Sequence, residues 1–102
     1  VGSEMCIREG KALDKIARDI ITEAGYGDNF GHSLGHGVGV EIHESPYASP
    51  SREDILPENS IVTVEPGIYL EGKFGVRIED FVVVTENGCI NMTKAPKELI
   101  CL

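Results

Sequence analysis

All three histidines of the sequence lie within one glycine-rich stretch, GHSLGHGVGVEIHE, from residue 31 to residue 44. They are His32, His36 and His43, and four glycines are interleaved with them. His32 and His36 have the i, i+4 spacing of metal ligands on a helix, but the surrounding glycines disfavour a helix. Glycine instead lets the backbone approach a ligand closely. Since imidazole with carboxylates suits Mn²⁺, Co²⁺, Zn²⁺ or Fe²⁺, the stretch predicts a metal site.

A second stretch, IVTVEPGIYLEGKFGVRIED (residues 61–80), brings two carboxylates together if its middle reverses direction at Gly72. Paired residues then have numbers that sum to 144, which places Glu65 opposite Glu79. Side chains directly across an antiparallel ladder lie about 4.5–5.5 Å apart at Cβ, and like charges there are destabilising. A proton, a cationic side chain such as Arg77, or a metal ion would relieve the repulsion.

Two alternatives to this pairing stay open. Pro66 favours an edge or a bulge beside Glu65, and a bulge would shift the register. Alternatively, both glutamates lie on a solvated strand face, although their valine, isoleucine and glycine neighbours argue against such a face.

The elements that position these residues can be read from the periodicity of the chain. An apolar face at helical spacing predicts an amphipathic helix that begins near Lys11 and ends at Gly25 as its C′ residue. Its charged face is predicted to be solvated, and it consists of Lys11, Asp14, Lys15, Arg18, Asp19 and Glu23. The apolar positions are Leu13, Ile16, Ala17, Ile20, Ile21 and Ala24.

Valine- and isoleucine-rich segments, punctuated by glycine and proline, predict strands after this helix. Residues 44–60 contain three prolines and are expected to form mostly loop. Residues 86–88, Glu-Asn-Gly, predict a turn between the last two strands. The expected fold class is therefore α+β, with one helix followed by antiparallel strands. The expected strands are 40–43, 61–65, 76–85 and 89–93.

Composition limits the partners and the compartment. The chain has 102 residues, a formal net charge of −8 and no apolar run long enough to span a bilayer, which excludes nucleic-acid and membrane partners. The three cysteines, Cys6, Cys89 and Cys101, are irregularly spaced, so reduced thiols in a cytoplasmic protein are expected. No secretory leader is expected either.

Three motifs, HSLGHGVGVEIHESP, VTVEPGIY and GVRIED, in this order and at these intervals, resemble the Xaa-Pro peptidases. These are the prolidases and aminopeptidases P of the pita-bread (creatinase/aminopeptidase-like) metallopeptidase superfamily. The resemblance covers residues 12–99 and implies hydrolysis of Xaa-Pro bonds in proline-containing peptides. It also implies two divalent metal ions, most often Mn²⁺, with Co²⁺ or Zn²⁺ as alternatives.

The resemblance assigns a role to each matched residue. It implies that His36, Glu65 and Glu79 are metal ligands, with Glu79 bridging the two ions and Glu65 also shuttling a proton. It implies that His32 holds substrate, that His43 stabilises the tetrahedral intermediate, and that Arg77 contacts substrate or supports Glu79. These roles agree with general chemistry, because two metal ions lower the pKa of a water molecule and polarise the scissile carbonyl. A nearby carboxylate can then transfer the proton, and an imidazole can stabilise the developing charge.

The family's two aspartate ligands lie upstream of the histidine motif and have no counterpart in this sequence. Residues 1–102 are therefore expected to be the C-terminal portion of a catalytic domain, with an incomplete metal site and no activity alone. Strands that lack the other half of the domain would expose apolar faces, so self-association or a homo-oligomer is expected. The alternative function is a non-catalytic pita-bread module that binds peptide or protein.

Overall fold

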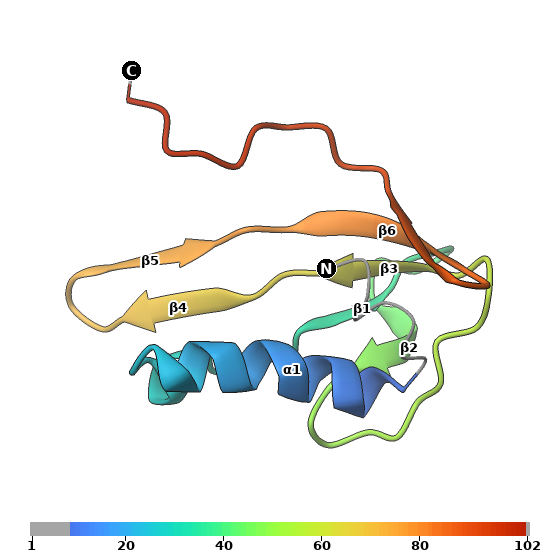
Figure 1. The fold of residues 1–102 in the computed structure, drawn as a ribbon, viewed down its shortest axis with the longest axis horizontal. Helices are drawn as coiled ribbons and strands as arrows, with labels where there is room; N and C mark the ends of the chain where they lie inside the picture. Colours follow the sequence, from blue (N-terminus) through green and yellow to red (C-terminus); the bar gives the residue numbers. More distant parts are fainter. Residues whose placement is uncertain (1–8, 102) are drawn as a thin grey trace.

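The computed structural model describes residues 9–101. One helix, α1 (Gly10–Glu23), and a short 3₁₀ turn, η2 (Gly27–Asn29), come before seven antiparallel strands (Figure 1). This order confirms the predicted α+β class. The strands are β1 (Gly35–Gly37), β2 (Glu44–Ala48), β3 (Ile61–Val64), β4 (Gly67–Leu70), β5 (Phe74–Arg77), β6 (Asp80–Thr85) and β7 (Gly88–Asn91).

Helix α1 ends where the sequence predicts. Gly25 has a φ of 93°, and its N–H donates to the carbonyl of Thr22 at 2.9 Å. The N–H of Tyr26 donates to the carbonyl of Ile21 at 3.0 Å. This pair of bonds is a Schellman motif, in which a residue of left-handed conformation satisfies the last carbonyls of the helix.

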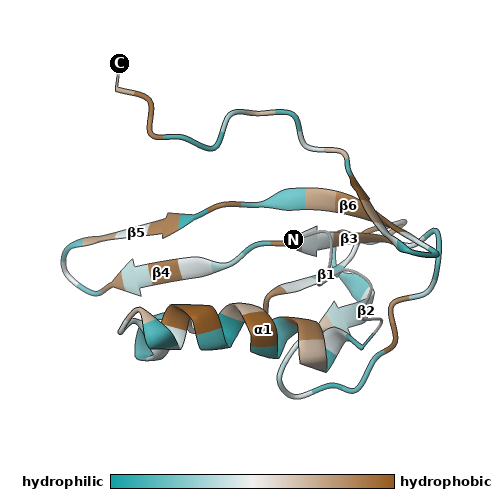
Figure 2. Cartoon of the chain, in the orientation of Figure 1, coloured by the Kyte–Doolittle hydropathy of each residue, from teal (hydrophilic) through white to brown (hydrophobic). Residues whose placement is uncertain are grey.

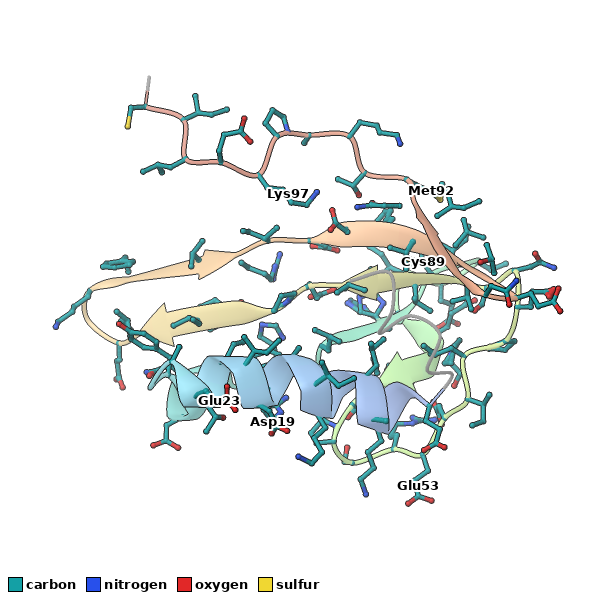
Figure 3. The ribbon with its side chains drawn as sticks, in the orientation of Figure 1. Asp19, Glu23, Glu53, Cys89, Met92 and Lys97 are labelled. Carbon is teal, nitrogen blue, oxygen red and sulfur yellow. The ribbon has the colours of Figure 1, made fainter. Side chains whose placement is uncertain are left out.

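The prediction that the whole charged face of α1 is solvated is wrong at two positions. Asp14 is fully buried, and the side chain of Arg18 is only 27% exposed. The reason is geometric: Asp14 lies three residues before Ala17 and seven before Ile21, so it shares their face of the helix. Asp19 and Glu23 do lie on the outer face of the helix, away from the sheet (Figure 3).

The strands form a five-stranded sheet, in the order β2-β1-β3-β6-β7, and a separate two-stranded β4–β5 hairpin. Helix α1 runs alongside strand β4, and its first turns lie beside β2 (Figure 1). Hydrophobic and hydrophilic bands alternate along α1, whereas β6 carries a continuous hydrophobic stretch (Figure 2). One buried apolar cluster joins the helix, the loops and the sheet. Its members are Leu13, Ile21, Phe30, Leu34, Ala48, Leu56, Val62, Val82 and Val84.

The predicted reversal at Gly72 and its register are confirmed. Gly72 has a φ of 75°, which favours glycine, and Gly67 pairs with Arg77 across the hairpin. The register continues into the main sheet, where Val64 pairs with Asp80. Both pairs sum to 144. Glu65 lies between β3 and β4, and Glu79 lies between β5 and β6. The shared register of the two ladders therefore places these glutamates opposite each other.

Two strand predictions and one loop prediction need correction. Residues 40–43 are not a strand but a bent loop, and the strand is β2, within the segment predicted to be mostly loop. β2 contains the cis Ser45–Pro46 bond and is an edge strand, where a residue without N–H is tolerated. The predicted strand 76–85 is split into β5 and β6. It breaks opposite Pro66, which has no N–H to donate to a ladder.

The predicted turn at residues 86–88 does connect β6 to β7, and Thr85 pairs with Gly88. Within residues 9–101, neither Cys89 nor Cys101 forms a disulfide, and Cys6 lies outside the described residues. The described part of the chain has no helix long and apolar enough to cross a bilayer.

Candidate metal centre

His36 lies in the middle of strand β1, between two glycines that bring neighbouring backbones close to it. A Cβ on Gly35 would overlap the carbonyl of Thr63, and one on Gly37 would overlap the carbonyl of Ser45. The N–H of His36 donates to Oγ1 of the buried Thr63 at 3.1 Å. Glycine is therefore required here for close approach of β1 to the neighbouring backbone, whereas the sequence pattern predicts close approach of a ligand.

The imidazole of His36 faces the carboxylate of Glu65. Nε2 of His36 lies 3.3 Å from Oε2 of Glu65, and their side chains are only 15% and 14% exposed. The other ring nitrogen, Nδ1, lies 2.9 Å from the carbonyl oxygen of Gly37, which can only accept a hydrogen bond. Nδ1 therefore carries the hydrogen, and in the neutral ring Nε2 directs its lone pair at the carboxylate.

Two facing lone-pair donors are the arrangement that a cation would complete. A histidine ligand commonly donates its second N–H to a backbone carbonyl, which fixes the ring, and His36 does so through Gly37. Imidazole nitrogen with carboxylate oxygen is also a donor set for borderline divalent ions. Residues 9–101 contain no group of three or more histidine, cysteine, aspartate or glutamate side chains gathered closely enough to hold a metal ion. His36 and Glu65 thus fit part of a metal site.

Glu79 and Arg77 line the same hollow as His36 and Glu65, together with His43. Nη2 of Arg77 lies 3.6 Å from Oε2 of Glu79, and these side chains are 51% and 34% exposed. The guanidinium therefore offsets part of the repulsion between the two facing glutamates. The half-buried Glu65 and Glu79 do not lie on a fully solvated face, which confirms the expectation from their neighbours.

His43 reaches the hollow from the bent loop that follows β1. Its ring lies 4.3 Å from the ring of His36, centroid to centroid, with an interplanar angle of 55°. The structure thus brings together five of the six predicted site residues at one hollow, and an adjoining hollow adds the sixth, His32.

His32 is held by a partner that the sequence analysis does not identify. Its Nε2 lies 2.8 Å from the hydroxyl of Tyr69, and its Nδ1 lies 2.8 Å from the carbonyl oxygen of Ser33. Since that carbonyl only accepts, Nδ1 carries the hydrogen, and in the neutral ring Nε2 accepts from Tyr69. Tyr69 is four residues after Glu65, on the arm that leads into the predicted reversal at Gly72, and this spacing is the signal that could have identified it.

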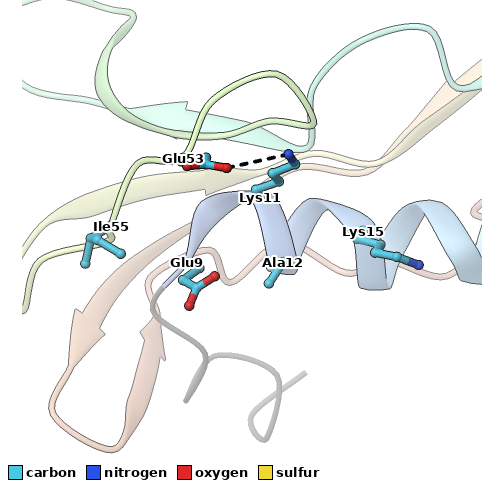
Figure 4. A pocket seen from close by; sticks show the side chains of 6 residues that line it. All are labelled: Glu9, Lys11, Ala12, Lys15, Glu53 and Ile55. Atoms are coloured by element: carbon cyan, nitrogen blue, oxygen red, sulfur yellow. Dashed lines mark ion pairs between the residues drawn. The ribbon is translucent and has the colours of Figure 1, made fainter.

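A separate hollow at the start of α1 contains none of these residues. It is lined by Glu9, Lys11, Ala12, Lys15, Glu53 and Ile55 (Figure 4). Its charged groups are exposed, and Nζ of Lys11 lies 3.8 Å from Glu53. We therefore place the candidate centre at the histidine and glutamate hollow.

Comparison with known proteins shows the class of protein to which this arrangement belongs. Residues 5–86 match metallopeptidase family M24, and the chain belongs to that family. The chain is 58% identical over 90 residues to the Xaa-Pro dipeptidase of Pyrococcus furiosus, a match that covers 88% of this chain and 26% of the relative.

Solved structures give the same result. The chain superposes on the Xaa-Pro dipeptidase from Bacillus anthracis with a TM-score of 0.89 and 53% identity, over 92% of this chain and 26% of that one. It superposes on the X-Pro aminopeptidase from Thermotoga maritima with a TM-score of 0.87 and 53% identity, over 94% and 28%. The fold is thus a partial pita-bread fold, and the chain spans about a quarter of the length of these relatives.

Proposed function

We propose that this chain carries one wall of the active site of a dinuclear metallopeptidase that hydrolyses Xaa-Pro bonds. The observation that carries the proposal is the 3.3 Å approach of His36 Nε2 to the Glu65 carboxylate, with Glu79 lining the same hollow. The relatives named Xaa-Pro dipeptidase support the substrate class. The protein is proposed to be cytoplasmic and to act on proline-containing peptides.

In this proposal His36, Glu65 and Glu79 would hold the metal ions, with Mn²⁺ favoured over Co²⁺ or Zn²⁺. Bound divalent ions supply Lewis-acid activation of water and of the scissile carbonyl. The two aspartate ligands that the family resemblance implies would come from a part of the protein upstream of this C-terminal portion. The ligand set of the isolated chain is then incomplete.

The remaining roles are those that the family resemblance implies, and the positions of the side chains support them. The Glu65 carboxylate, only 14% exposed, accepts the proton of the attacking water and delivers it to the leaving nitrogen. The ring of His43, which lies tilted beside that of His36, stabilises charge on the carbonyl oxygen. His32, fixed by Tyr69, holds the substrate, and Arg77 supports Glu79 or contacts substrate.

Calorimetric titration of Mn²⁺ into the 102-residue chain tests the proposal. We expect weak binding that Glu79→Ala abolishes, since the substitution removes a ligand. Glu71→Ala, the same change in the exposed β4–β5 turn, is the matched control and should leave binding unchanged. Binding that is insensitive to Glu79→Ala would contradict the assignment of the ligands.

Peptidase assays on an Xaa-Pro dipeptide complete the test. The isolated chain with added Mn²⁺ is expected to be inactive because the upstream ligands are missing. Hydrolysis by this chain at a rate comparable to that of a complete relative would show that it builds a working centre by itself, which would overturn the incomplete-site part of the proposal.

A further inference from the structure

A buried ion pair on helix α1 lies directly behind the histidine segment. Nε of Arg18 donates to Oδ1 of Asp14 at 2.9 Å, and Nη2 of Arg18 donates to Oδ2 at 3.2 Å. The side chain of Asp14 is 1% exposed. Burying two charges costs desolvation free energy, so such a pair is weak evidence for stability and calls for another explanation.

The other hydrogen bonds of this pair all go to the segment that carries His32. Nη1 of Arg18 donates to the carbonyl of Phe30 at 2.8 Å, and Nη2 donates to the carbonyl of His32 at 2.9 Å. Oδ2 of Asp14 accepts the N–H of Leu34 at 2.9 Å. The pair thus holds the backbone on both sides of His32.

The same pair also reaches the His32 ring through Phe30. The guanidinium of Arg18 lies 4.2 Å from the centroid of the Phe30 ring. The Phe30 ring in turn meets the His32 ring edge-on, with centroids 5.1 Å apart. Since residues 30–34 form neither helix nor strand, no ladder fixes His32, and these contacts take that place.

We propose that Asp14 and Arg18 are positioning residues that hold the imidazole of His32 against Tyr69 at the edge of the metal centre. The planar fork of arginine is needed because one guanidinium bonds a carboxylate and two carbonyls at once, which the single ammonium of lysine cannot reproduce. The inference rests on the proposed function for what His32 does to substrate, while the positioning itself is independent of catalysis.

The neighbouring pair on α1 shows the contrast. Nζ of Lys15 lies 2.6 Å from Oδ2 of Asp19, again at i, i+4, but these side chains are 73% and 56% exposed. No hydrogen bond from Lys15 or Asp19 to residues 30–34 is found in the described part of the chain. Lys15→Arg, which also exchanges the two cationic groups, and Asp19→Asn are therefore matched controls for Arg18→Lys and Asp14→Asn.

The test is NMR of the 102-residue chain without metal, using the nuclear Overhauser effect between the rings of His32 and Tyr69. The two ring centroids lie 5.4 Å apart in the native arrangement. In Arg18→Lys we expect at least a threefold loss of this effect and a change in the ¹⁵N chemical shifts of the His32 ring. The ring signals of His43 should stay unchanged. Both controls should retain it. A folded Arg18→Lys that keeps the full effect, and shows only a lower unfolding temperature, would overturn the proposal.

Two further measurements keep the proposal testable if Arg18→Lys does not fold. Asp14→Asn retains an acceptor for Leu34 but loses the charge, and it should show the same loss of the His32–Tyr69 effect. In the unaltered chain, the Leu34 amide should exchange its hydrogen at least tenfold more slowly than in an unfolded peptide. Retention of the effect in Asp14→Asn, or unprotected exchange at Leu34, would refute the inference. Neither readout depends on Mn²⁺ binding or hydrolysis, so failure of the proposed function is a separate result.

Discussion

Replacing Thr63 with valine measures how firmly His36 is held in strand β1. Thr63 is 1% exposed, and its Oγ1 accepts the backbone N–H of His36 at 3.1 Å. Valine has nearly the same shape but no acceptor, so this N–H would lose its partner beside a buried side chain. An unsatisfied buried donor costs about 1–3 kcal/mol. For a chain of this length, each kcal/mol lowers the unfolding temperature by about 4–8 °C.

A second threonine provides the control. Oγ1 of Thr93 accepts the N–H of Phe81 at 2.9 Å, but this bond lies in an exposed setting where water can replace it. Thr93→Val should therefore cost about 0.5 kcal/mol, at the lower end of the net value of a hydrogen bond. Urea denaturation of both variants, without metal, gives the two free energies of unfolding. Equal costs, or a smaller cost at Thr63, would refute the view that the hydroxyl fixes His36 within a closely packed sheet.

The remaining predictions concern packing, the Tyr69 contact and association. Gly35→Ala should lower the free energy of unfolding by about 3 kcal/mol, because the added Cβ would overlap the carbonyl of Thr63. A Cβ at Gly31 meets nothing within 4 Å, so Gly31→Ala should change this free energy by less than about 1 kcal/mol. Equal denaturation midpoints for the two variants would contradict this prediction. Tyr69→Phe should change the ¹⁵N chemical shift of His32 Nε2, because the substitution removes the hydroxyl that bonds this nitrogen. An unchanged chemical shift would exclude that hydrogen bond in solution. The chain should self-associate through its exposed apolar hairpin, where Val76 is 53% exposed, and light scattering that shows only monomer at high concentration would count against this.

The β4–β5 hairpin could be predicted because its register depends on local information. A turn centred on Gly72 fixes every pair by symmetry, and the period of two along a strand then decides which side chains share a face. Glu65 and Glu79 are close in sequence, so the same local information brought them together. The break in the ladder at Pro66 also follows from a single residue, through its missing N–H.

The β1–β2 region could not be predicted in the same way. Its valine and isoleucine residues favoured a strand at 40–43, but the strands are β1 at Gly35–Gly37 and β2 at Glu44–Ala48, which includes Pro46. Which segment becomes the edge strand depends on the space beside Gly37, where the carbonyl of Ser45 approaches. Such close backbone approaches are tertiary information, and the periodicity of one strand does not contain them.

The buried Asp14–Arg18 pair was missed because charge on a helix normally indicates solvent. Its partners, the carbonyls of Phe30 and His32, are backbone groups, and every residue type carries such groups. The residue types of segment 30–34 therefore do not indicate that its carbonyls accept hydrogen bonds from a side chain. The usable signal was the spacing of Asp14 from Ala17 and Ile21, which places a charged residue on an apolar helix face.

The candidate centre owes its geometry to backbone contacts more than to contacts between its own side chains. His36 is held by Thr63 and by the carbonyl of Gly37, and the N–H of Glu65 donates to the carbonyl of Leu34 at 2.8 Å. Two of these bonds, from His36 to Thr63 and from Glu65 to Leu34, join the β1 segment to the β3 segment, so folding of the sheet aligns the imidazole with the carboxylate. A cation that enters then meets donors already ordered, so little side-chain entropy is lost on binding. The same reasoning extends to His32, for which the helix pair replaces the sheet as the source of order.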